Sequence, residues 1–394
     1  MQFHRSAHAG SLRPTAANKI LDMGADPAII SLAAGNPAPE AYPIAAVQDI
    51  TRRILEEEPL EALQYSVPQG DPSLRRAVTD WMRSRYGCGR EFDDCVIVSG
   101  AQQGGDLTAR ILCDPGDIVL CEEPTFLGCL DAFRAAGARL RGVPMQEDGI
   151  DVDALEAALR EGGPIRFLYT IPNFQNPTGI TMSMEKRRRV YELAVQYDIL
   201  ILEDNPYGDL RFHGEALPPI KSLDETGHVI YMGSFSKILA PGVRTGYVLA
   251  HRDLIAQYTT LKSACDVHSN ILAQKICYRF LTEQDMDAHL AGLAAVYRRK
   301  STLMLDAFDR CFDSRVTRTE PDGGLFVWCT LPEGCDSQPF AASAAEAGVL
   351  VVPGAGFMTD PETISRSFRL NYSTPSDEAI LRGMEILGRL THSL

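Results

Sequence analysis

Between residues 94 and 250 the chain alternates short apolar runs with longer segments whose apolar residues recur at helical spacing. The apolar runs predict buried strands, and the periodic segments predict helices. The expected strands cover residues 95–98, 117–121, 139–143, 166–170, 199–203, 228–232 and 243–250, and the expected helices begin at 100 and span 126–136, 152–160 and 184–197. Continuously apolar strands joined through helices are typical of an α/β fold with a mostly parallel sheet covered by helices on both faces.

The segments on either side follow a different pattern. Helices are expected at 15–23, 44–57 and 73–86, the last capped by Ser73, and one long helix or two abutting helices are expected at 285–312. Strands at 315–319, 324–330, 349–352 and 367–371 then alternate with helices at 338–347 and from 376 onward. This pattern predicts a smaller α+β domain. The expected division is an N-terminal arm that packs with the small domain (1–45), a large domain (46–275) and a small C-terminal domain (276–394).

Composition narrows the class of protein. The 394 residues are 45% hydrophobic, which allows a large core, and the formal net charge of −14 argues against binding nucleic acid through bulk electrostatics. The ten cysteines occur singly, without zinc spacing, so reduced thiols of a cytoplasmic protein and no metal site are expected. The sequence predicts neither a signal peptide nor a membrane-spanning segment.

Two hydroxyls, a lysine and an arginine lie on one short connection between expected core strands, in Gly233-Ser234-Phe235-Ser236-Lys237 and at Arg244. Hydroxyls and a guanidinium suit a phosphate, and a desolvated lysine near another cation can form a Schiff base with an aldehyde. A phosphate plus an aldehyde describes pyridoxal 5′-phosphate (PLP). The alternative is a solvated loop with an ordinary lysine and arginine, because the motif is short.

Other candidates follow the ends of expected strands, where ligands bind in sheets of this kind. Ser99-Gly100-Ala101-Gln102 joins a strand to a helix and offers free backbone N–H groups to an anion, although plain glycine turns look the same. Asp204 ends an apolar strand and would suit a pyridinium N–H, or else cap a turn. Tyr207 and Asn176 could donate hydrogen bonds to an oxygen on the cofactor ring, although Asn176-Pro-Thr-Gly read alone is a turn. Phe126 could stack on that ring, although an aromatic residue there is more often part of the core.

Arg369 lies inside an apolar strand, in Ser367-Phe368-Arg369-Leu370. A buried arginine is costly unless it is paired. A substrate carboxylate would be a natural bidentate partner, and a structural salt bridge is the alternative.

Five motifs occur in a fixed order: Asn176-Pro-Thr-Gly, Asp204-x-x-Tyr207, Ser234-x-Ser-Lys237, Arg244 and Phe368-Arg369-Leu370. Through these motifs the sequence resembles the fold-type I PLP-dependent aminotransferases of class I and II. The resemblance extends from about Ser31 to the last helix. Within the group it looks most like the branch of kynurenine/2-aminoadipate and aromatic or branched-chain aminotransferases, through Pro172-Asn-Phe-Gln-Asn-Pro-Thr-Gly and Gly323-Gly-Leu-Phe-Val-Trp328.

The resemblance implies a role for each matching residue. Lys237 would hold PLP, Asp204 would face its pyridine nitrogen, and Asn176 with Tyr207 would bond its ring oxygen. The phosphate would lie among Ser99, Ala101, Gln102, Ser234, Ser236 and Arg244, with Phe126 stacked on the ring and Tyr65 reaching in from the second subunit of a homodimer. Arg369 and Asn176 would hold the substrate carboxylate, and Gly35 and Arg13 would lie near its side chain. Asn36 stands where many relatives carry an apolar residue.

The implied function is transfer of an amino group between an L-amino acid and a 2-oxo acid such as 2-oxoglutarate, in two half-reactions. Freed Lys237 would act as the general base at the substrate Cα. Two alternatives stay open. One is a PLP-dependent lyase or decarboxylase of the same fold. The other is an aminotransferase-like domain of a transcription regulator, which the acidity and the absence of a basic helical module before residue 31 disfavour.

Overall fold

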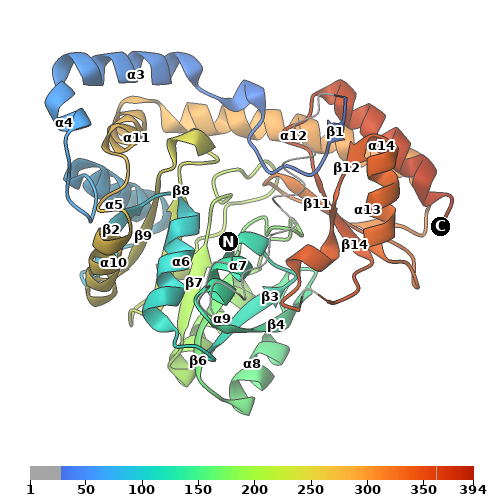
Figure 1. Cartoon of the computed structure of the whole chain (residues 1–394), viewed down its shortest axis with the longest axis horizontal. Helices are drawn as coiled ribbons and strands as arrows, with labels where there is room; N and C mark the ends of the chain where they lie inside the picture. The colour runs from blue at the N-terminus through green and yellow to red at the C-terminus, as the bar shows by residue number, and fades with distance from the viewer. Residues whose placement is uncertain (1–27, 361) are drawn as a thin grey trace, which may run out of the picture.

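A computed structural model describes residues 28–360 and 362–394, so Arg13 and the helix expected at 15–23 lie outside the described residues. An eight-stranded sheet forms the centre of the molecule (Figure 1). Its strands lie in the order β2 (Asp93–Val98), β9 (Gly246–His251), β8 (Val229–Ser234), β7 (Leu200–Asp204), β6 (Ile165–Thr170), β3 (Ile118–Glu123), β4 (Arg139–Gln146) and β5 (Gly149–Ile150). Neighbouring strands from β8 to β4 are parallel, and β9 and β5 are antiparallel to their neighbours, which confirms the predicted mostly parallel sheet.

Helices cover both faces of this sheet because alternate strand residues point to opposite sides. On one side Val119 and Cys121 join a core cluster with side chains of α6 (Ala101–Leu112), α7 (Leu127–Ala135) and α10 (Arg252–Cys265). On the other side Ile118 and Leu120 join a second cluster with α8 (Val152–Glu161) and α9 (Met184–Tyr197). Two separate apolar layers therefore hold the sheet in place, and the polar residues at the strand ends are not needed for this packing.

Five further helices contribute side chains to the first core cluster. They are α3 (Ile44–Glu57), α4 (Pro59–Leu63), α5 (Pro72–Tyr86), α11 (Ile271–Glu283) and the long α12 (Met286–Cys311). The cap of α5 differs from the prediction: the Asp71 side chain accepts the N–H groups of Ser73 and Leu74, because Pro72 takes the first helical position and places the cap one residue earlier. No helix in the described part of the chain is both long and apolar enough to cross a membrane.

A smaller antiparallel sheet has the order β10 (Thr317–Arg318), β11 (Phe326–Thr330), β14 (Ser367–Asn371) and β13 (Val352–Pro353), and α13 (Ser337–Glu346) and α14 (Asp377–Thr391) lie beside it. The N-terminal strand β1 (Ile30–Ser31) pairs in parallel with β12 (Val349–Leu350), so the blue N-terminal segment of Figure 1 lies among the orange and red elements. Short 3₁₀ turns complete the chain: η1 (Pro39–Ala41), η2 (Ile220–Leu223), η3 (Pro241–Val243) and η4 (Gly354–Phe357). The domain limits given above stay a prediction.

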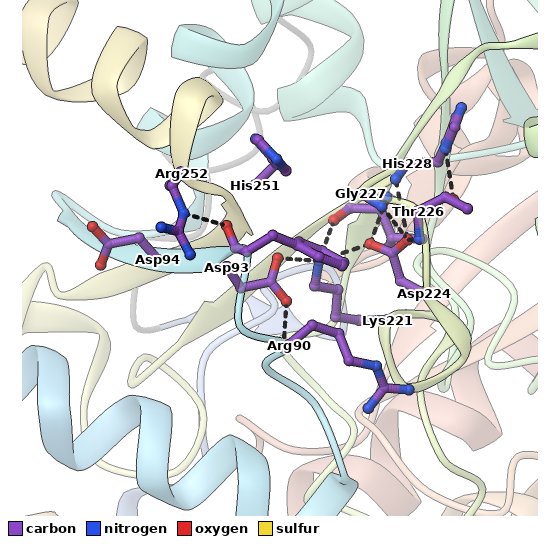
Figure 2. A network of polar contacts seen from close by, with 12 residues as sticks. Arg90, Asp93, Asp94, Lys221, Asp224, Thr226, Gly227, His228, His251 and Arg252 are labelled. Atoms are coloured by element: carbon purple, nitrogen blue, oxygen red, sulfur yellow. Dashed lines mark hydrogen bonds and ion pairs between the residues drawn. The ribbon is translucent and has the colours of Figure 1, made fainter.

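A buried ion cluster ties the connection between β7 and β8 to the first residues of β2 and β8 (Figure 2). The Lys221 ammonium donates to Asp93 Oδ1 at 2.8 Å, to Asp224 Oδ2 at 2.8 Å and to the Val229 carbonyl at 2.9 Å. The Asp224 carboxylate also accepts backbone N–H groups from Gly227, His228 and Val229. Every charge in this cluster thus has an opposite charge or a dipole beside it.

Candidate active site

The ends of five strands meet at one edge of the large sheet and open onto a cavity of about 490 Å³. The carboxyl ends of β2, β3, β6, β7 and β8 share this edge with the start of β9, because β9 is the antiparallel member among them. Residues singled out from the sequence that line the cavity are Gly35, Asn36, Ala101, Gln102, Phe126, Asn176, Asp204, Tyr207, Ser234, Ser236, Lys237, Arg244 and Arg369. The fold therefore brings together side chains from seven separate segments of the chain.

Lys237 follows β8 on a turn and is partly buried at the cavity wall. Its Nζ donates to the Gly35 carbonyl at 2.7 Å, and no ion pair joins it to a carboxylate of the described residues. Burial and, to a smaller extent, the neighbouring cations Arg369 and Arg244 together lower the pKa of Lys237 to about 8. At neutral pH this amine is therefore unprotonated far more often than that of an ordinary lysine, as a nucleophile or general base requires.

Asp204 is the last residue of β7 and is almost completely buried. Its Oδ2 accepts a hydrogen bond from the Tyr169 hydroxyl at 2.8 Å, whereas Oδ1 is buried and has no hydrogen-bond partner in the part of the chain that the structure describes. Burial raises the pKa of Asp204 to about 6, and the Tyr169 hydrogen bond acts in the opposite direction. A buried carboxylate oxygen without a donor is costly, so a cationic N–H group in the cavity would complete this site.

A second end of the cavity suits an anion. The first residues of α6, Ala101 and Gln102, lie there with the hydroxyls of Ser234 and Ser236 and with Arg244. The Arg244 guanidinium donates to the Ser99 and Pro241 carbonyls, at 3.1 and 3.2 Å. Backbone N–H groups at a helix N-terminus, hydroxyls and a guanidinium are the donors that bind phosphate groups.

The backbone of Gly100 and the Arg244 guanidinium lie close together at this end of the cavity. A Cβ atom at Gly100 would lie 2.2 Å from Arg244 Nη2, and the φ angle of Gly100 is +77°. Only glycine fits both conditions. Ser99 is placed differently from the other candidates: its hydroxyl contacts Asp266 Oδ2 at 3.2 Å and Ser269 Oγ at 3.0 Å, and Ser99 is not among the residues that line the cavity. Its hydroxyl faces the end of α10 because the polar partners lie there.

Arg369, on β14, points into the cavity from the small sheet. It donates to Asn176 Oδ1 at 2.7 Å and to the Ala33 carbonyl at 2.6 Å, and it lies over the rings of Phe326 and Phe357. Burial lowers the pKa of Arg369 to about 10. Among the described residues no carboxylate forms a salt bridge with Arg369, and its buried Nε has no acceptor, so the alternative of a structural ion pair finds no partner there.

The remaining candidates divide into two groups. Asn176 Nδ2 donates to the Tyr207 hydroxyl at 3.3 Å, and Phe126, Gly35 and Asn36 line the cavity. Tyr65 is not among the residues that line this cavity: it is 81% exposed, and its ring packs edge-on against the His268 ring.

Sequence reasoning missed several residues of the cavity wall, namely Leu127, Cys129, Ile171, Phe326 and Val352. It also missed Tyr169, which holds Asp204. The apolar residues carry no chemical signal. Tyr169 could have been found from strand periodicity, since it shares a sheet face with the residues that point toward α7.

Comparison with known proteins places this geometry in context. The family model described as aminotransferase class I and II matches residues 27–387. The chain is 40% identical to an aromatic-amino-acid aminotransferase of Thermococcus litoralis over 91% of this chain and 87% of that protein, and 36% identical to a 2-aminoadipate transaminase of Thermus thermophilus over 98% and 96%. It superposes on the crystal structure of a Pyrococcus horikoshii kynurenine aminotransferase in complex with PMP with a TM-score of 0.95 and 35% identity, covering 99% of this chain and 97% of that one.

Proposed function

Because the chain belongs to the aminotransferase class I and II family, we propose that the cavity at the sheet edge is its active site, with the residue roles given below. The protein is a PLP-dependent aminotransferase of fold type I. When bound, PLP supplies an aldehyde that reacts with amines and a pyridinium ring that withdraws electrons from the substrate carbon.

The cavity residues fit this cofactor. Asp204 Oδ1 lacks a hydrogen donor among the described residues and would accept the ring N–H. The phosphate would lie among Ala101, Gln102, Ser234, Ser236 and Arg244, Asn176 and Tyr207 would donate to the ring oxygen, Phe126 would stack on the ring, and Lys237 would supply the amine. Ser99 would contribute through the backbone of its loop, since its hydroxyl is bonded elsewhere.

Arg369 would bind the substrate carboxylate with the help of Asn176. The single observation that carries this proposal is a buried guanidinium without a carboxylate partner in residues 28–360 and 362–394, held at the cavity wall between two aromatic rings. With the carboxylate held there, Lys237 on the same cavity wall would act as the general base that takes the substrate Cα proton. The fixed carboxylate also disfavours loss of CO₂, the decarboxylase alternative.

Replacing Arg369 tests this role. We expect Arg369→Gln to raise the KM for an amino acid by about 10- to 100-fold, because a charge-assisted hydrogen bond is lost. Arg366→Gln is the control, since Arg366 is exposed and lies three residues earlier on the same segment. Steady-state kinetics with an unchanged KM for Arg369→Gln would contradict the proposal.

We propose that the amino donor carries a large apolar or aromatic side chain and that a 2-oxo acid such as 2-oxoglutarate is the acceptor. The support is the apolar wall of Leu127, Ile171, Phe326 and Val352, together with the kynurenine and aromatic-amino-acid aminotransferases among the similar proteins. The absorbance of the cofactor reports each half-reaction separately, so donors can be screened one at a time. Faster conversion by aspartate than by phenylalanine or kynurenine would overturn this assignment. Pyruvate and ammonia formed without an acceptor would indicate a lyase.

The proposal includes a homodimer with shared active sites. Leu60, Leu63, Tyr65, Val67 and Val267 are large exposed apolar residues around α4 and the loops beside it, and an apolar patch of this kind favours association. Tyr65 would reach the phosphate in the second subunit. Mixing Lys237→Ala with Tyr65→Ala protein tests this arrangement, because a mixed dimer contains one site with both residues intact. We expect the mixture to exceed the summed activities of its parts, and no gain would place Tyr65 at its own subunit's site.

A further inference from the structure

Tyr169 is the next-to-last residue of β6 and is not among the residues that line the cavity. It pairs in register with Leu202 of β7, so its side chain shares a sheet face with Leu202 and with Asp204 two residues further on. This parity places the Tyr169 hydroxyl beside the Asp204 carboxylate. The Phe133 ring of α7 meets the Tyr169 ring edge-on, with centroids 5.3 Å apart, and fixes it from the helix side.

The hydrogen bond from Tyr169 makes the two carboxylate oxygens of Asp204 different. Oδ2 accepts from the Tyr169 hydroxyl at 2.8 Å, and Oδ1 has no partner among the described residues. Tyr169 is completely buried, and burial holds the pKa of its hydroxyl well above the usual range, so this group stays a donor throughout the working pH range. A carboxylate with one oxygen fixed cannot rotate freely, and its second oxygen has a defined direction.

A donor to Oδ2 also favours the ionised form of Asp204, because the hydrogen bond stabilises the carboxylate. With PLP bound, Asp204 Oδ1 would face the ring N–H. A less basic carboxylate would leave more of that proton on nitrogen, where it would make the ring an electron acceptor.

We propose that Tyr169 is a positioning residue that orients Asp204 and keeps the shared proton on the cofactor nitrogen. The inference rests on the proposed role of Asp204. Tyr169 is not among the residues that line the cavity, so its effect on the cofactor passes mainly through Asp204, to which its hydroxyl donates.

The test compares Tyr169→Phe with Tyr258→Phe. Both tyrosines are completely buried, and the Tyr258 hydroxyl bonds to Thr108, so the control loses a buried hydrogen bond far from Asp204. We expect Tyr169→Phe to weaken PLP binding by about tenfold, to lower kcat with little change in KM, and to move the ¹⁵N signal of labelled PLP toward that of a neutral pyridine. We expect the control to leave the ¹⁵N signal unchanged. Equal ¹⁵N signals in the two variants would overturn the proposal.

A double-mutant cycle with Asp204→Asn tests the role proposed for Tyr169 separately from the role proposed for Asp204. If Tyr169 acts through Asp204, the Tyr169→Phe change has less than about a twofold effect on PLP affinity in the Asp204→Asn background. If Asp204→Asn itself leaves the affinity and the ¹⁵N signal unchanged, the role proposed for Asp204 is wrong. If Asp204→Asn has a large effect and Tyr169→Phe has the same effect in both backgrounds, only the inference about Tyr169 is wrong.

A second substitution covers the case in which Tyr169→Phe folds poorly. Fluorinated tyrosine at position 169 keeps the hydroxyl and makes it a stronger donor. We expect the ¹⁵N signal to move toward the protonated ring, opposite to the direction for phenylalanine, and a shift in the same direction as phenylalanine would contradict the proposal.

Discussion

Lys221 and Lys237 lie at opposite edges of the same sheet and have opposite surroundings. Lys221 contacts the first residues of β2 and β8, whereas Lys237 follows the last residue of β8. Lys221 is completely buried between two carboxylates and a carbonyl. Lys237 has one carbonyl as its partner in the described part of the chain, and its charged neighbours are two arginines.

One acid at each edge, Asp224 and Asp204, shows the same contrast. Burial alone would raise the pKa of Asp224, but the Lys221 ammonium and backbone N–H donors outweigh it and hold that pKa below its ordinary value. Burial raises the pKa of Asp204 to about 6, because one tyrosine hydroxyl does not offset it. Paired charges at the amino edge stabilise the fold, and unpaired charges at the carboxyl edge are free to bind a cofactor and substrate.

The largest expected effect comes from removing the lysine at the carboxyl edge. We expect Lys237→Ala to lower kcat by about 10⁴-fold or more, because the proposed general base and the amine proposed to hold the cofactor would be lost together. The melting temperature of the apo protein should change little, since Lys237 makes a single hydrogen bond in the described structure. Transamination at the normal rate by this variant would show that another group performs the reaction.

The amino edge should respond in the opposite sense. We expect Lys221→Met to lower the free energy of unfolding by about 3–5 kcal/mol, because Asp93 and Asp224 are left as buried charges without their cation. Chemical denaturation of the apo protein measures this change. The kcat of the folded, PLP-loaded fraction should be near that of the unmodified enzyme, and Lys221→Met/Asp224→Asn should recover part of the lost stability. Equal stability of Lys221→Met and the unmodified protein would remove the contrast between the two edges.

The smallest effect concerns pH. The rate at which the apo protein reacts with pyridoxal should rise with pH and level off above about 8, because the amine of Lys237 must lose its proton first. Since the pKa of Lys237 is lower in the folded than in the unfolded state, its contribution to apo stability should grow as pH rises from about 8 toward the unfolded value.

Arg369→Gln removes one of the cations that lower the Lys237 pKa, so the midpoint of this pH profile should move upward, with less than about a tenfold change in rate near neutral pH. The exposed Arg366→Gln serves as the control. A midpoint that stays in place would mean that Arg369 does not contribute to the low pKa of Lys237.

The sequence predicted much of the fold because its strands and helices have strong, consistent periodicity. The helices at 44–57 and 184–197 and the strand at 367–371 have the predicted limits. The cap of α5 was predicted at Ser73 instead of Asp71, because both residues can cap and only the position of Pro72 decides between them. The five-residue helix α4 was not predicted, since one turn carries no period.

The amino-acid sequence by itself indicated the family and the cofactor and predicted which side chains carry chemistry, because these depend on residue types in a fixed order along the chain. The tertiary structure decided which of these groups are unpaired. Lys221 and Lys237 are sixteen positions apart, and their residue type alone does not distinguish them. Only the three-dimensional neighbours, two carboxylates for one and two arginines for the other, separate a structural lysine from a reactive one. Electrostatic energy depends on distance and burial, and neither is written in local sequence.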